Sequence, residues 1–257
     1  FSFSQLKAFE TCPYQYYLNF ILKIPVPGKA VFSFGKTMHS TLQQFFDLIK
    51  ISENSNQTDL FAADKKETKV DKKKLPSLKK LLELYEQNWI DDWYATKEDK
   101  AKYKKLGVES LKNMHAELSA SELPQVLELE KPFNFKLGGY TIRGVIDRVD
   151  QLPNGKVEIV DYKTGSPKDE KKVEKDQLLL YQMAAEETFG WQVEKLTFYY
   201  LNNNSKVSFL GTDKEIDKQK EKTLDLIKGI LTTDFPALPA THSCKYCDFN
   251  DICSYKQ

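Results

Sequence analysis

Two acids and a lysine gather at two strand-like runs in the middle of the chain. Asp147 ends one run, 140–146, and Asp161 with Lys163 closes a second. The turn at 152–155, Leu-Pro-Asn-Gly, predicts a β-hairpin that brings these side chains to one place. Carboxylate oxygens suit a hard cation such as Mg²⁺ or Mn²⁺. A neighbouring lysine can orient a water and the metal can stabilise charge on a phosphate oxygen, so the set predicts metal-assisted phosphodiester hydrolysis.

Four cysteines form a second group, with Cys12 near the start and Cys244, Cys247 and Cys253 near the end. Four thiolates can hold a zinc ion or an iron–sulfur cluster. A zinc ribbon usually has two C-x-x-C pairs, and this chain has one. Free buried thiols, or two disulfides in a secreted protein, are the alternatives to a metal centre.

The pattern Asp147…Asp161-x-Lys163 resembles the signature of the PD-(D/E)xK nuclease superfamily. The sequences at 144–148 and 161–165 resemble its RecB-like branch in particular, and further matches are Gly35-x-x-x-His39, Gln177-x-x-x-Tyr181 and the cysteine set. The resemblance implies an α/β fold with a central mixed β-sheet flanked by helices, a restriction-endonuclease-like core. It also implies a helical insertion and a cysteine-cluster staple that joins the termini.

The resemblance further implies which groups do the chemistry. The ligands of Mg²⁺ or Mn²⁺ would be His39, Asp147, Asp161 and the backbone carbonyl of Tyr162. Lys163 would position or polarise the attacking water. Gln177 and Tyr181, four residues apart on one helix face, would contact the DNA backbone. The four cysteines would hold a structural 4Fe–4S cluster, with zinc as the alternative.

Several of these residues have simpler interpretations. A lone histidine on a helix, such as His39, is often a surface or core residue, although an imidazole suits Mn²⁺. Gln177 could be solvated and Tyr181 could belong to the core. Glu130 lies on an alternating strand, where an acid usually faces solvent. The resemblance to the RecB-like branch instead implies a role near the site, because a Glu often precedes the hairpin there; we leave Glu130 out of the predicted ligand set.

The two arginines of the chain flank the motif around Asp147. Arg143, four residues earlier, shares the strand face of Asp147 and is a candidate for phosphate contact. Arg148 should point to the opposite face, which suggests a structural role.

Composition agrees with an enzyme domain. The chain has 257 residues, 40% of them hydrophobic, and a net charge of +1. A near-neutral nuclease must concentrate its positive charge locally. The sequence has no apolar run long enough for a membrane span and no signal peptide, which predicts a cytoplasmic protein without a membrane partner. The start at Phe1 is what we expect of a piece of a longer chain.

The expected organisation has four parts. They are N-terminal helices with the first cysteine and the histidine motif (1–50), a mobile lysine-rich loop and helical insertion (51–122), the nuclease core (123–235) and a C-terminal cysteine segment (236–257). The first helix is expected from an N-cap at Ser4 and a second runs to about Ile49. Further helices are expected at 77–95, 98–120, 174–189 and 213–231, and strands at 126–137, 140–146, 157–163, 195–201 and 206–210. Pro132 inside the first strand suggests an edge or a bulge.

The sequence therefore predicts a metal-dependent DNA nuclease. The resemblance points to an exonuclease that acts on single strands or duplex ends beside a helicase in DNA repair or recombination. Two alternatives stay open: a free-standing CRISPR-associated nuclease that processes spacers, and a catalytically silent DNA-binding or scaffold module. The intact Asp147, Asp161 and Lys163 argue against the silent module.

Overall fold

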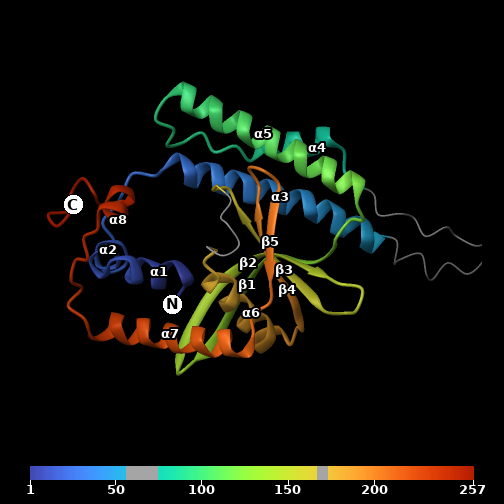
Figure 1. Ribbon diagram of the computed structural model, residues 1–257. Coiled ribbons are helices and arrows are strands. Elements are labelled where there is room, and N and C mark those ends of the chain that lie inside the picture. Colours follow the sequence, from blue (N-terminus) through green and yellow to red (C-terminus); the bar gives the residue numbers. More distant parts are fainter. Residues whose placement is uncertain (56–74, 167–172) are drawn as a thin grey trace, which may run out of the picture.

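A mixed β-sheet forms the centre of the computed structural model, which describes residues 1–55, 75–166 and 173–257 (Figure 1). Within these residues the sheet has five strands in the order β1-β2-β3-β4-β5. The strands are β1 (Gln125–Leu137), β2 (Tyr140–Gln151), β3 (Val157–Lys163), β4 (Val193–Tyr200) and β5 (Ser205–Phe209). Only the pair β3–β4 is parallel, and α6 (Asp176–Phe189) connects these two strands. The predicted mixed sheet is confirmed.

Helices cover both faces of the sheet (Figure 1). One face carries α3 (Ala30–Ser55), α4 (Leu78–Gln87) and α5 (Lys97–Ala120), and the other carries α1 (Phe3–Thr11), α6 and α7 (Asp213–Thr232). Because strand side chains alternate, Ile159 joins the core under α6 while its neighbour Val160 joins the core under α3. The α/β fold with flanking helices is therefore confirmed. None of the helices in the described part of the chain has the length and apolar character that crossing a bilayer requires.

The cap of the first helix differs from the expected one. Ser2, not Ser4, accepts the hydrogen bond from the backbone N–H of Gln5, and the Gln5 side chain accepts one from the backbone N–H of Ser2. This reciprocal capping box satisfies two donors, which a cap at Ser4 would not do.

The N-terminal segment also breaks where a continuous helix was expected. After α1 come α2 (Pro13–Tyr16) and a π-helical turn, Tyr17–Ile21. Pro13 has no N–H and holds the residue before it in an extended conformation, so the helix ends at Cys12. Cys12 therefore lies between α1 and α2 with an extended backbone.

Other helix boundaries shift for local reasons. Helix α4 stops at Gln87 rather than near 95, because the Asn88 side chain donates to the Leu84 carbonyl and closes the helix. Helix α3 continues beyond Ile49 to Ser55, since no glycine or proline lies between these two residues. Most of the predicted mobile loop, 56–74, lies outside the described residues. The expected edge position of Pro132 is confirmed, since β1 is an edge strand with a bulge between Val126 and Glu128.

Candidate functional site

Strands β2 and β3 separate at the two predicted metal-binding acids. Their antiparallel pairing ends at Arg148↔Val160, and the next position in register sets Asp147 opposite Asp161. Here the backbone N–H of Tyr162 donates to Asp147 Oδ2 at 2.8 Å, so a side chain takes the place of the ladder bond. Asp147 therefore lies inside β2, and not at the end of a strand as the sequence had suggested. The open hairpin end leaves room for groups from neighbouring elements.

A third acid, Glu130 on β1, lies in the same cross-strand row. The pairs on either side of Glu130 place it opposite Asp147. Its φ of 44° is left-handed, which costs an ordinary residue about 1–3 kcal/mol and is typical of functional sites. One donor atom each of Glu130, Asp147 and His39 lies within 4.8 Å of the other two. Glu130 is thus a candidate ligand that was left out of the predicted set.

A signal for Glu130 was present in the sequence. Gly138 and Gly139 both have positive φ, 54° and 86°, and form the two-residue turn between β1 and β2. A two-residue turn fixes the register of the whole hairpin, so counting back from it pairs residue 130 with residue 147. Alternation of polar residues along β1 had instead suggested a solvated side chain.

His39 reaches the acids from the opposite layer. It lies on α3, with Nδ1 at 3.5 Å from Asp147 Oδ1 and Nε2 at 3.2 Å from the carbonyl oxygen of Tyr162. A Cβ at Gly35 would lie 3.6 Å from Thr164 Oγ1, an ordinary contact, so the space there does not require glycine. Burial alone would lower the pKa of His39, but the hydrogen bond and charge of Asp147 and the charges of Asp161 and Glu130 raise it to about 9. The imidazole is held in a strongly negative environment.

Lys163, Gln177 and Asp161 form a closed hydrogen-bonded group. Lys163 Nζ lies 2.6 Å from Asp161 Oδ2 and donates to Gln177 Oε1 at 2.8 Å. The Gln177 amide donates in turn to Asp161 Oδ1 and to the Tyr181 hydroxyl, each at 2.8 Å. Gln177 and Tyr181, on α6, therefore orient the acid and the lysine. Their contact with DNA stays a prediction.

The charge distribution suits a cation. Burial and the neighbouring Asp147 raise the pKa of Asp161 to about 7, against the opposing effect of Lys163 and His39. Burial and Asp147 likewise raise the pKa of Glu130. Carboxylates crowded in this way favour either a proton or a metal ion. Hard carboxylate and carbonyl oxygens with one imidazole form a donor set that fits Mg²⁺ or Mn²⁺.

Arg143 does not join this group. Its side chain is exposed and, within the described residues, shares no hydrogen bond or ion pair with the site. Its backbone N–H donates to the carbonyl of Phe1, where residues 1–2 pair alongside β2. The predicted phosphate contact of Arg143 has no support from this geometry and stays a prediction.

Arg148 lies on the opposite face, in line with the expected structural role. Its guanidinium is buried against the Phe46 ring, 4.3 Å from the ring centroid, and donates to Asp150 Oδ2 at 3.0 and 3.1 Å. It also donates to the hydroxyl of Tyr162 at 2.6 Å. Tyr162 separates Asp161 from Lys163, so Arg148 fixes the strand that carries both.

Removing this anchor should destabilise the protein. Tyr162→Phe leaves the buried Arg148 without one partner, so we expect the free energy of unfolding to fall by about 2 kcal/mol, the usual cost of a hydrogen bond to a charged group. Urea denaturation measures this, with Tyr140→Phe on β2 as the control, because no hydrogen bond of its hydroxyl is found in the described structure. Equal stability of the two variants would contradict the anchor.

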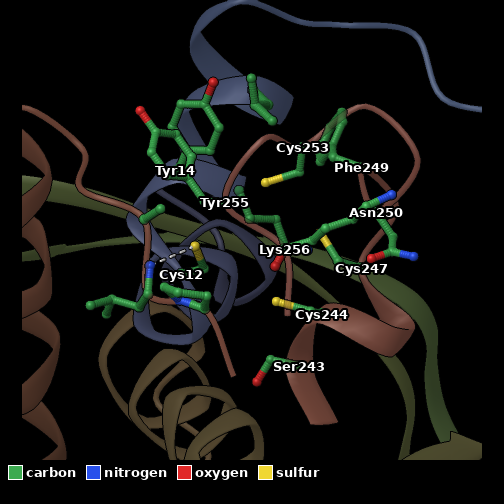
Figure 2. Close-up of a pocket in the computed structure, with 15 residues that line it drawn as sticks. Cys12, Tyr14, Ser243, Cys244, Cys247, Phe249, Asn250, Cys253, Tyr255 and Lys256 are labelled. Atoms are coloured by element: carbon green, nitrogen blue, oxygen red, sulfur yellow. Dashed lines mark hydrogen bonds between the residues drawn. The ribbon is translucent and has the colours of Figure 1, made fainter. Parts of the chain in front are cut away.

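The four cysteines meet at one pocket, far from this site along the sequence. Figure 2 shows Cys12, Cys244, Cys247 and Cys253 around one space, with their sulfur atoms turned toward it. None of the four is in a disulfide. The pocket wall includes apolar side chains, among them Leu18 and Phe249. An all-thiol donor set fits either an iron–sulfur cluster or zinc.

Local structure brings these thiols together. The helix break at Cys12 presents the first sulfur, which accepts a hydrogen bond from the backbone N–H of Leu238 at 3.4 Å. Helix α8 (Thr241–Tyr246) carries Cys244 and ends at Cys247. Burial raises the pKa of Cys247, and the charges of Asp248, Cys12 and Cys253 add to this effect. The N- and C-terminal segments of the chain therefore share one cluster of sulfur atoms.

Comparison with known proteins gives one match over nearly the whole chain. The model of the PD-(D/E)XK nuclease superfamily matches residues 1–254. Two curated relatives are the "Gene 69 protein" of Mycobacterium phage L5, 31% identical over 132 residues, and that of Mycobacterium phage D29, 28% identical over 132 residues. Each alignment covers 49% of this chain and 43% or 47% of the phage protein, so the matched segment spans less than half of either relative. A solved structure described as "Crystal structure of SSO0001" is 20% identical, covers 62% of this chain and 79% of its own, and has a TM-score of 0.36.

Proposed function

Because the chain belongs to the PD-(D/E)XK nuclease superfamily, we propose that it is a divalent-metal-dependent deoxyribonuclease with its active site at the open end of the β2–β3 hairpin. One observation carries this proposal: Asp147, Asp161 and Lys163 meet there, joined through Tyr162 and Gln177. Nucleases of this superfamily use divalent metals such as Mg²⁺, and the carboxylate and histidine groups of this site could bind one.

The proposed ligands of Mg²⁺ or Mn²⁺ are His39, Asp147, Asp161 and the Tyr162 carbonyl, and the geometry adds Glu130. When bound, the ion would act as a Lewis acid that stabilises charge on the phosphate. The chain's own residues prepare the site. Gln177 holds Asp161 and Lys163 at fixed positions, and Lys163 has its ammonium group beside Asp161, where it can orient a water and donate a hydrogen bond to the phosphate.

Metal binding should become tighter as the pH rises. Ligands bind a metal only when deprotonated, and the raised pKa values of about 9 for His39 and about 7 for Asp161 mean that protons occupy them at lower pH. Mn²⁺ affinity should therefore rise between about pH 6 and about pH 8, by up to roughly tenfold per pH unit for each proton displaced. Calorimetry in buffers of different ionisation enthalpy counts the released protons. His39→Ala should bind Mn²⁺ more weakly and show a shallower pH dependence, while an unchanged profile would remove His39 from the ligand set.

We propose that the four cysteines hold a structural 4Fe–4S cluster. The converging thiols, the apolar wall and the N–H donor to Cys12 support a closed all-sulfur centre. The single C-x-x-C pair favours iron over a zinc ribbon. Four sulfur ligands leave no open coordination position, so the centre would join the chain ends rather than take part in hydrolysis.

The finer parts of the proposal rest on the sequence resemblance to the RecB-like branch. They are exonuclease activity on DNA ends, association with a helicase in the same chain or complex, and a role in DNA repair. A free-standing nuclease that processes spacers is the alternative within the same chemistry.

Cleavage of labelled DNA tests the proposed function. The protein should degrade linear single-stranded DNA with Mg²⁺ or Mn²⁺, and EDTA should stop the reaction. Asp161→Asn should be inactive with either metal. Circular single strands separate an exonuclease, which leaves them intact, from an endonuclease. If the wild-type protein cuts no DNA with either metal, the silent module is the better description.

A further inference from the structure

One face of α3 leads from the proposed active site to an exposed aromatic ring. Phe32, Lys36 and His39 follow one another at i, i+4 and i+7, so their side chains line the same side of the helix. All three line one hollow of ≈ 490 Å³, together with Thr164, which directly follows Lys163. The hollow therefore continues from the proposed metal ligand His39 along the helix to Phe32.

Phe32 is unusually exposed for a large aromatic residue. Its side chain is 62% exposed, and the adjacent Val31 is 48% exposed. Phe34, two residues along the same helix, is buried in the core and shows where an aromatic that serves only packing lies. An uncovered ring about 10 Å along the helix from His39 is within reach of a nucleotide that flanks the cleaved phosphate.

A second hollow adjoins the first and shares Val31 and Thr164 with it. It measures ≈ 500 Å³, and its wall includes Lys102, Tyr103 and one acid, Asp99. Volumes of this order are typical of ligand pockets. The two hollows together form what we call the α3 groove, whose wall includes Val31, Phe32, Lys36, His39, Asp99, Lys102, Tyr103 and Thr164.

In the described part of the chain, the groove has two lysines without an ion-pair partner, against one acid in its wall, Asp99. Lys36 and Lys102 are exposed, and among the described residues neither has an acidic side chain within ion-pair distance. By contrast, Lys100 and Lys104 on the same helix α5 pair with Asp91 and Glu86. A near-neutral chain thus presents unpaired ammonium groups beside the site where a phosphate would react.

We propose that the α3 groove binds unpaired nucleotides of the substrate strand, with a base stacked on Phe32 and a phosphate at Lys36. This inference deepens the proposed function and rests on it. Single-strand binding proteins combine a basic groove with aromatic rings on which bases stack. A base in a duplex has both faces covered by its neighbours, so a ring like that of Phe32 selects a strand whose bases are free.

Fluorescence anisotropy of a labelled single-stranded oligonucleotide tests the groove without catalysis, in EDTA and in Ca²⁺. Phe32→Ala should weaken binding by about 5- to 100-fold, the usual effect of losing one stacked base, and Phe32→Trp should retain it. Leu231→Ala is the matched control, since Leu231 is 58% exposed at the end of α7 on the other face. Lys36→Ala should lower both the affinity and its dependence on salt.

Two further readouts separate stacking from general contact. Scanning the oligonucleotide with 2-aminopurine should find a position whose emission is quenched by the wild type but not by Phe32→Ala. Duplex of the same sequence should bind equally well to both proteins. If Phe32→Ala binds single strands like the wild type, if it loses duplex binding to the same extent, or if the wild type binds no single strand in either buffer, the inference is wrong.

The outcomes also distinguish this inference from the nuclease proposal. Binding that depends on Phe32 without any metal-dependent cleavage keeps the groove and rejects the nuclease. Cleavage with normal affinity and KM in Phe32→Ala keeps the nuclease and rejects the groove.

Discussion

Replacing Lys163 should abolish DNA cleavage while leaving the fold intact. Its ammonium group lies 2.6 Å from Asp161 Oδ2 and is held by Gln177, so it is fixed at the place where a water and a phosphate would meet the metal. Positioned groups that transfer protons or stabilise charge contribute roughly 10²–10⁴-fold to rates. We expect Lys163→Ala and Lys163→Gln to lower kcat by at least about a hundredfold, measured in single-turnover assays with Mg²⁺ and with Mn²⁺.

Lys163→Gln guards against loss of the fold, because a glutamine can still hydrogen bond to Asp161 and Gln177. The matched control is Lys195→Ala on the neighbouring strand β4. This lysine lies away from the site and pairs with Glu158 at a distance of 3.1 Å. The control should cut DNA at the wild-type rate. A Lys163→Gln protein that cuts as fast as the control would show that the lysine has no part in the reaction.

The second large effect concerns the cysteine centre. Cys12 and Cys244 lie near opposite ends of the chain, and a centre that holds both closes a very long loop. By analogy with a disulfide, such a crosslink lowers the entropy of the unfolded chain and stabilises the fold by on the order of 5 kcal/mol. Cys244→Ser should therefore melt at a much lower temperature, lose its brown colour and reduce cleavage indirectly.

Iron analysis of protein purified without oxygen gives the companion result. The wild type should contain about four irons per chain, as a cubane cluster requires. Ser243→Ala is the control, because Ser243 lines the same pocket without offering a sulfur. One zinc per chain would keep the crosslink and reject the cluster. If the wild type is purified without any metal and Cys244→Ser melts at the same temperature, the crosslink is rejected.

Much of the site could be predicted because it depends on short-range pattern. The hairpin turn places Asp147 near Asp161 whatever surrounds it, and an i, i+4 spacing places Gln177 and Tyr181 on one helix face. His39 depended on the family resemblance, because no local rule brings α3 over the open end of the hairpin. Its distance of 3.5 Å from Asp147 is a result of tertiary packing.

Other features were not predicted from the sequence, because a second physical effect overrode the pattern that was used to predict them. Helix periodicity in the first segment suggested one helix, but Pro13 ends that helix and leaves Cys12 in an extended conformation between α1 and α2. Alternation on β1 suggested a solvated Glu130, but the register set by the glycine turn and the positive φ of Glu130 turn that acid toward His39. The α3 groove needed the structure, since only packing shows that Phe32 stays uncovered while Phe34 is buried.

The most direct test of the metal site is the anomalous signal of Mn²⁺ in crystals of the protein soaked in that ion. We predict a peak bounded by His39, Asp147, Asp161 and the Tyr162 carbonyl, which Asp161→Asn abolishes. A second acidic cluster, Glu10, Glu174 and Asp176, offers an internal comparison on the surface. Manganese at that cluster alone, with none beside Asp147, would contradict the proposed active site.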